Sequence, residues 1–114
     1  MRDQRLVNLG DIAGSATGRS GVVWTLEGST DLNANLVSFR AGGGVREHVN
    51  DELDVLIVGV SGSGSVSVGG EEHPVSSGVM VFVPKGARRS TWAAAEGFAY
   101  LSVHRRRGPL QIGG

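Results

Sequence analysis

The sequence predicts one small all-β domain that folds as an antiparallel β-barrel. Apolar and polar residues alternate with a period of two along much of the chain, which is typical of half-buried strands. Nineteen of the 114 residues are glycine, and they are spread between short apolar stretches as expected for many tight turns. A chain of this length has room for one hydrophobic core, so residues 1–114 are expected to form a single domain.

The expected strands are short and are separated by turns rich in glycine, serine and proline. Gly69-Gly70 predicts a tight hairpin, because glycine tolerates the positive φ that both central positions of a type I′ turn require. Two further turns are expected at residues 61–64 and 93–97. The extended segments are expected at 21–26, 32–40, 45–60, 65–68, 71–75, 79–83, 88–92 and 98–105.

The two ends of the chain are weakly patterned. Residues 1–20 are expected to form a strap across the barrel, with a short turn of helix or extended chain at Asp11-Ile-Ala. Residues 105–114 are expected to form a loose tail, and the three arginines at 105–107 are interpreted as a solvated basic segment.

Composition argues against several classes of protein. The 11 basic and 11 acidic residues give no net charge, which argues against a general nucleic-acid binder. The absence of cysteine excludes disulfides, thiolate nucleophiles and cysteine-based zinc sites. The apolar run at residues 55–60 is too short to span a bilayer, and the charged start lacks a signal-peptide pattern. We therefore expect a cytoplasmic protein without nucleic-acid or membrane partners.

One expected strand carries a polar and an apolar face, because side chains alternate across an extended chain. A polar face turned into a barrel is a site, whereas the same face turned to solvent is not, and the alternation leaves both open. The polar set is Arg46, His48, Asn50, Glu52 and Asp54, and the apolar set is Leu53, Val55 and Ile57.

Residues 42–62 resemble the first of two motifs that mark the cupin superfamily. The family pattern is a Gly, five residues, His-x-His, three or four residues, Glu, six residues and Gly. His48 stands at the second His, and Glu52 and Gly59 follow in the family spacing. Arg46 occupies the position of the first His.

Residues 78–93 resemble the second cupin motif, which is a Gly, five residues, Pro-x-Gly, two residues, His, three residues and Asn. Gly78, Pro84 and Gly86 match in the family spacing, and Arg89 occupies the His position. The resemblance implies a jelly-roll barrel, or double-stranded β-helix, whose metal-ligand positions are degenerate in both motifs.

The resemblance also implies that the polar face turns into the barrel. The family's metal site uses three His and one Glu, a donor set that suits divalent iron, manganese, zinc or nickel. His48 and Glu52 alone remain here, and Arg46 and Arg89 place permanent positive charges at ligand positions. We therefore expect no tightly bound cofactor. The alternative is a divalent transition metal on His48 and Glu52, with further donors from Asn50, Asp54 or His104.

The leading hypothesis is a metal-free cupin that binds a small polar or acidic molecule through Arg46, His48, Glu52 and Arg89. The planar fork of arginine suits a carboxylate or phosphate, and His48 is then available as a catalytic acid or base. One alternative is a metal-dependent enzyme of dioxygenase, isomerase or epimerase type. Another is a structural or regulatory dimer with an inert barrel, so enzymatic activity stays open.

Resemblance and exposed strand edges together predict a homodimer. Trp24 and the N-terminal segment are the expected interface. On the last expected strand, alternate side chains point to opposite sides, and the pattern leaves open which set lines the barrel interior. The first set is Tyr100, Ser102 and His104, and the second is Ala99, Leu101 and Val103.

Overall fold

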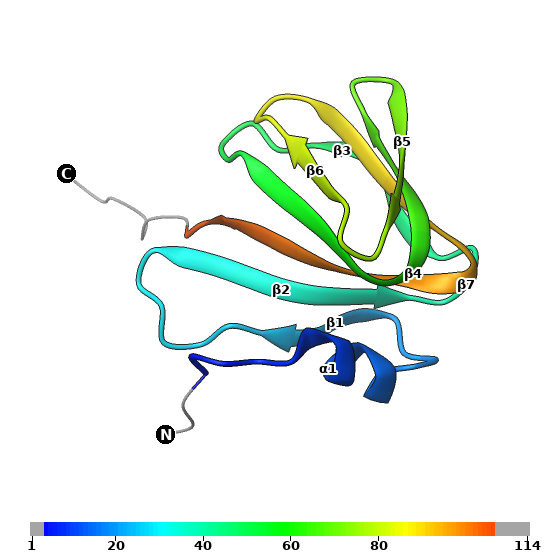
Figure 1. The fold of residues 1–114 in the computed structure, drawn as a ribbon. Coiled ribbons are helices and arrows are strands. Elements are labelled where there is room, and N and C mark those ends of the chain that lie inside the picture. Colours follow the sequence, from blue (N-terminus) through cyan, green and yellow to red (C-terminus); the bar gives the residue numbers. More distant parts are fainter. Residues whose placement is uncertain (1–3, 107–114) are drawn as a thin grey trace.

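The computed structural model describes residues 4–106, which form one helix and seven strands (Figure 1). Every strand pairing is antiparallel, so the predicted all-β antiparallel fold is confirmed. In the described range, no helix is long and apolar enough to cross a membrane. The elements are α1 (Leu9–Ser15), β1 (Gly21–Thr25), β2 (Leu32–Phe39), β3 (Gly44–Val49), β4 (Val55–Val68), β5 (Glu71–Ser76), β6 (Met80–Val83) and β7 (Arg88–Arg105).

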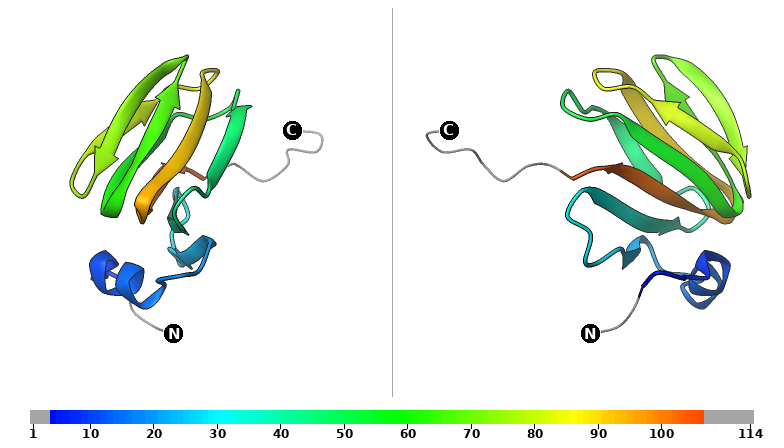
Figure 2. Two further views of the ribbon diagram at one scale, coloured as in Figure 1. Left: turned by 90° about the vertical axis from the view of Figure 1, so that its right-hand side faces the viewer. Right: turned by 60° about the vertical axis from the view of Figure 1, so that its left-hand side comes forward.

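Two long, bent strands hold the barrel together. The first part of β7 pairs with β3 and with the end of β4, whereas its second part pairs with β2 and with the start of β4. β4 also pairs with β6 near its start and with β5 near its end. Figure 2 shows β3–β7 curled around a common interior, with β2 beside β7 and with β1 and α1 at one end of the molecule.

The turns predicted at 61–64 and 93–97 are wrong, because both segments lie inside continuous strands. Between Gly59 and Gly64 the register of β4 against β7 shifts twice, so the strand bends while its pairing continues. A Cβ on Gly64 would lie 2.5 Å from the carbonyl oxygen of Trp92 and 2.5 Å from the ring of Phe98. The glycines therefore allow close strand approach rather than chain reversal.

The single strand predicted at 45–60 divides into β3 and β4, and this overturns the prediction of one continuous polar face. Asn50 Oδ1 accepts hydrogen bonds from the backbone nitrogens of Glu52 and Leu53, at 2.9 and 3.2 Å, which forms a turn. The backbone nitrogen of Gly86 donates to the Asn50 carbonyl at 2.7 Å and anchors that turn. A bulge in β3 between Val45 and His48 changes the parity once more.

The glycines shared with the two cupin motifs have structural roles. Gly78 N donates to the Gly59 carbonyl at 2.9 Å, which joins one motif to the other. A Cβ on Gly59 would lie 2.0 Å from the Ser76 carbonyl oxygen, so no larger residue fits. The hairpin predicted at Gly69-Gly70 is confirmed, with φ of 61° and 88°, and it connects β4 to β5.

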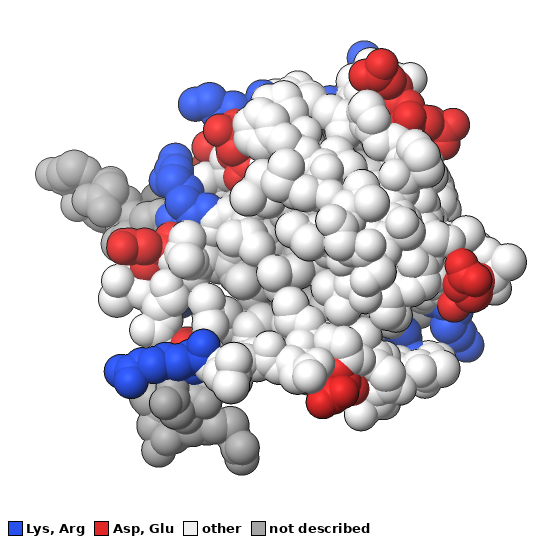
Figure 3. Space-filling model, viewed as in Figure 1, with Lys and Arg blue, Asp and Glu red and all other residues white. Residues whose placement is uncertain are grey.

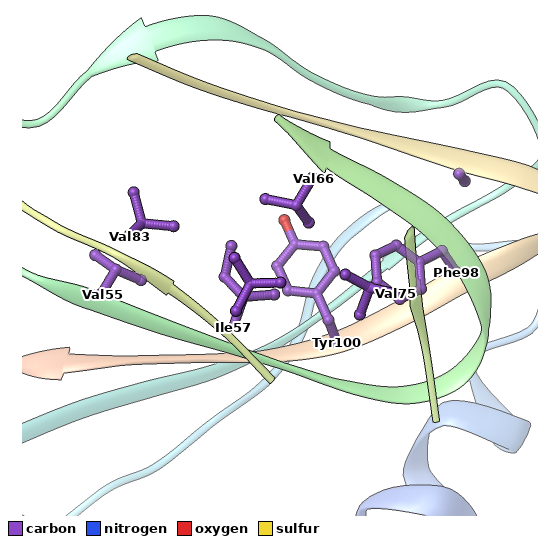
Figure 4. Close-up of a cluster of buried hydrophobic side chains, with 9 residues drawn as sticks. Val55, Ile57, Val66, Val75, Val83, Phe98 and Tyr100 are labelled. Atoms are coloured by element: carbon purple, nitrogen blue, oxygen red, sulfur yellow. The ribbon is translucent and has the colours of Figure 1, made fainter. Parts of the chain in front are cut away.

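Two apolar clusters lie on opposite faces of the sheet. The smaller one, Ala13, Leu36 and Ala99, is covered by α1, whose first turn is capped by Asn8 Oδ1 accepting from Asp11 N at 3.0 Å. The helical alternative predicted for Asp11-Ile-Ala is therefore confirmed. The larger cluster fills the barrel (Figure 4) and consists of Val55, Ile57, Val66, Val75, Val81, Val83, Ala93, Phe98 and Tyr100.

Candidate functional site

The pairing of β3 with β7 brings His48 and Arg89 together. The two residues are direct partners across the strand pair, and Arg89 Nε lies 3.0 Å from His48 Nε2. The β3 bulge lies immediately before His48 and turns its side chain to the same cavity as Val45, three residues earlier. A histidine of the first motif and an arginine of the second motif therefore lie side by side in the structure.

The hydrogen bonds of His48 define its protonation. An arginine guanidinium only donates, so His48 Nε2 accepts from Arg89 Nε. The other ring nitrogen, Nδ1, lies 2.9 Å from the carbonyl oxygen of Arg46, which only accepts. The geometry therefore describes a neutral imidazole with its proton on Nδ1, and both ring nitrogens are engaged.

Arg89 has one buried nitrogen without a partner. Nη1 of its guanidinium is fully buried and makes no hydrogen bond to any residue between 4 and 106. Burial lowers the pKa of Arg89, and the electrostatic interaction with Tyr100 opposes this effect. Arginine nevertheless keeps its charge in proteins, so a positive donor with unused capacity lies inside the barrel.

Nη1 belongs to a residue that lines a small inner cavity of about 90 Å³. Arg89 contributes the only formal charge among the lining residues when His48 is neutral. Tyr100 makes a side-chain hydrogen bond to Thr91, and burial raises the pKa of its phenol against the opposing effects of this bond and of Arg89. The lining consists of Val45, His48, Ile57, Arg89, Thr91, Tyr100 and Ser102.

A second, outer cavity of about 370 Å³ shares His48 and Arg89 with the inner one. These two residues therefore border both cavities. The outer cavity differs in charge, because its lining includes two carboxylates. The lining consists of His48, Val49, Asn50, Asp51, Glu52 and Arg89.

The other predicted site residues lie elsewhere. Arg46 is exposed and lines neither cavity. Asp54 Oδ1 accepts a hydrogen bond from the backbone nitrogen of Lys85 at 2.9 Å. His104 Nδ1 lies 2.8 Å from the Arg105 carbonyl oxygen, and its strand partner is Asn33. Among the predicted residues, the structure thus gathers His48, Asn50, Glu52 and Arg89.

The donor set does not fit a transition metal. No group of three or more histidine, aspartate or glutamate side chains converges anywhere in residues 4–106. The guanidinium of Arg89 occupies the hydrogen-bonding direction of His48 Nε2, where a metal ion would have to bind. Asn50 Oδ1 is committed to the turn after β3, and Asp54 and His104 line neither cavity.

Several lining residues were not predicted as site residues. Thr91 follows Arg89 by two residues on β7, so the sequence already indicated that both side chains lie on the same face of the strand. Val45 reaches the cavity through the β3 bulge, which no sequence pattern marks. Of the competing parities on the last strand, Tyr100 and Ser102 line the inner cavity, whereas Ala99 packs beneath α1.

No protein-family model and no curated protein sequence matches this chain. Solved structures do. A Klebsiella pneumoniae protein with a double-stranded β-helix domain has a TM-score of 0.73 and 15% identity, with 90% of each chain covered. An RmlC-like cupin from Shewanella frigidimarina has a TM-score of 0.66 and 19% identity, with 73% of each chain covered. KdgF from a Halomonas species has a TM-score of 0.69 and 21% identity, covering 75% of this chain and 77% of the other. The resemblance noted in the two motifs is thus confirmed in three dimensions: the chain has the cupin fold, a double-stranded β-helix.

Proposed function

We propose that this chain binds a small acidic molecule in its barrel, without a tightly bound metal. The buried, unpartnered Nη1 of Arg89 carries the proposal. A buried donor without a partner costs about 1–3 kcal/mol, and the cost is larger for a charged group. A ligand oxygen on this nitrogen removes that cost, and the bond is charge-assisted.

The inner cavity supports a carboxylate as the bound group. Its volume of about 90 Å³ corresponds to roughly three water molecules, enough for an anionic group but not for a whole metabolite. Ser102 lines the same cavity, and its hydroxyl is a further donor. The remainder of the molecule would occupy the outer cavity, which is about four times larger.

The two residues shared by the cavities have different tasks in this proposal. Arg89 contacts the anion, whereas His48 orients Arg89 by accepting its Nε–H bond at 3.0 Å. Nε is thereby occupied, and the terminal nitrogens are left to face the ligand. His48 in turn is held by the Arg46 carbonyl, so the backbone of β3 contributes to the position of the guanidinium.

The outer face of the sheet supports a homodimer as the quaternary state. Leu56, Met80 and Phe82 are exposed by 38%, 54% and 51%, and Leu56 and Phe82 are strand partners across β4 and β6. In Figure 3 the charged side chains lie around the edge of this face, and its centre is uncharged. An exposed apolar face on a chain with no net charge can pack against the same face of a second copy of the chain without charge repulsion.

The test of ligand binding uses butyrate as the probe, titrated into the protein and followed by NMR. We expect saturable binding at one site in the wild type and in Arg88→Gln, an exposed neighbour of Arg89. Arg89→Gln should weaken binding at least ten-fold, because a charged hydrogen bond contributes about 1.5–3 kcal/mol. Equal binding by the two variants would overturn the proposal.

Elemental analysis of protein purified without metal-affinity resin tests the metal-dependent alternative. We expect transition-metal content far below one per chain in both the wild type and His48→Ala. About one metal per chain, lost in His48→Ala, would instead support a metalloenzyme.

A further inference from the structure

The two cavities that share His48 and Arg89 differ in the charges of their lining residues. The inner cavity is lined by the positive charge of Arg89 and by no carboxylate. The outer cavity, which shares His48 and Arg89 with the inner one, is also lined by Asp51 and Glu52. A molecule with its anionic end at Arg89 therefore extends toward negative charge.

From this arrangement we infer that the site selects zwitterions: small molecules with a carboxylate at one end and an ammonium group at the other. The inference rests on the proposed function, since it assigns the carboxylate to Arg89. It adds Asp51 as a specificity-determining residue for the cationic end.

Asp51 is well placed for this role. It is exposed in the turn between β3 and β4, and its neighbour Asn50 fixes that turn by accepting two backbone hydrogen bonds. The turn is also tied to the Pro84–Gly86 segment through the bond from Gly86 N to the Asn50 carbonyl at 2.7 Å. A carboxylate on an anchored turn is pre-organised for binding, so little conformational entropy is lost when it pairs with a cation.

The same carboxylates disfavour ligands with a second negative charge. A dicarboxylate or a phosphate monoester bound at Arg89 would bring its other charge toward Asp51 and Glu52, where like charges repel. A monocarboxylate with an apolar tail lies between the two cases, because it neither gains nor loses by the charge of the rim. Asp51 and Glu52 therefore make the affinity depend on the second charged group of ligands that share the same carboxylate contact.

Three probes of the same chain length separate these cases: γ-aminobutyrate, butyrate and succinate, titrated at low ionic strength by calorimetry. An exposed charge pair changes Kd by a factor of up to about five, so attraction and repulsion together predict a ratio of up to about 25-fold. We expect γ-aminobutyrate to bind most tightly and succinate most weakly. Low salt is needed because exposed charges are screened at physiological ionic strength.

Asp51→Asn should reduce the ratio between γ-aminobutyrate and succinate several-fold. Glu47→Gln is the matched control, since Glu47 is an exposed carboxylate on β3 that lines neither cavity, and it should leave the ratio as in the wild type. Equal affinities for all three probes, or a ratio that Asp51→Asn does not alter, would overturn the inference while the carboxylate site stands. Absence of butyrate binding would refute the proposed function itself.

Discussion

Arg89 and His48 face each other across the pairing of β7 with β3, and Arg89 Nε donates to His48 Nε2 over 3.0 Å. Nη1 of the same guanidinium is buried, and no residue between 4 and 106 accepts a hydrogen bond from it. A protein selected for stability alone has no reason to keep a buried, unpaired guanidinium nitrogen in this position, because an apolar side chain of similar length would fill the space. The arrangement is one in which stability is lowered at the proposed binding site.

Replacement of Arg89 by methionine is therefore expected to abolish butyrate binding without destabilising the fold. The free energy of unfolding should stay unchanged or rise by up to about 2 kcal/mol, because the variant removes a buried unpaired donor. Urea denaturation followed by circular dichroism measures this.

The matched control is Arg88→Met, which alters the exposed neighbouring residue. It should keep butyrate binding and change stability by no more than about 0.5 kcal/mol. A loss of more than about 2 kcal/mol in Arg89→Met alone would identify Arg89 as a structural residue and favour the inert-barrel alternative.

Tyr100 predicts loss of stability at alkaline pH. Burial raises the pKa of its phenol in the folded state, so the folded protein binds this proton more tightly than the unfolded chain does. The contribution is fully present below the unfolded value of about 10 and is lost as the pH rises through the folded pKa. Unfolding by urea at a series of pH values should show the decline, and Tyr100→Phe should remove this part of it.

The chain contains one tyrosine, so the ultraviolet absorbance of phenolate reports this group alone. In the folded protein the absorbance should titrate with a midpoint above about 10. A midpoint at or below that value would show that the phenol is not shielded by the barrel.

Much of the fold was predictable because its signals are local. Gly69-Gly70 specifies a hairpin by conformation, and Gly59, Gly78 and Pro84 recur in a spacing that the cupin fold requires. The lengths of β4 and β7 were not predictable from the same glycines. In β4, Gly62 and Gly64 interrupt the alternation as a turn would, yet here they let Gly97 and Phe98 approach. Only the neighbouring strand distinguishes a bend from a chain reversal.

The sequence predicted His48 and Arg89 as residues of the candidate site, but it did not predict which of their neighbours lie beside them. His48 and Arg89 stand at ligand positions of the two motifs, which meet through backbone pairing whatever side chains they carry. The prediction of one continuous polar face was wrong, because a bulge in β3 and a turn formed by Asn50 each change the side of the strand on which the following side chains lie. Both features depend on single hydrogen bonds and register shifts that hydrophobic alternation does not encode.

The close approach at Gly59 predicts a large effect of a single methyl group. Gly59→Ala would place Cβ 2.0 Å from the Ser76 carbonyl oxygen, which is backbone and cannot rotate away. We expect a loss of about 3 kcal/mol or more in the free energy of unfolding. Gly14→Ala is the matched control, because Gly14 lies in α1 with open space around it, and it should stabilise the protein by about 0.5–1 kcal/mol. Equal stability of the two variants would contradict the packing described for β4.

The exposed apolar face of β4 and β6 predicts an association that one charge disrupts. Phe82 is 51% exposed at the strand position opposite Leu56, and a homodimer would bury both side chains. Sedimentation velocity should show a dimer for the wild type and a monomer for Phe82→Glu, with unchanged circular dichroism. Val22→Glu is the control, since Val22 is 57% exposed on β1, away from the face. Trp24, which was expected at the interface, is partly buried against the cluster that α1 covers, whereas Phe82 and Met80 on β6 are more than half exposed. A Phe82→Glu protein that still sediments as a dimer would place the interface elsewhere, and a monomeric wild type would remove the homodimer altogether.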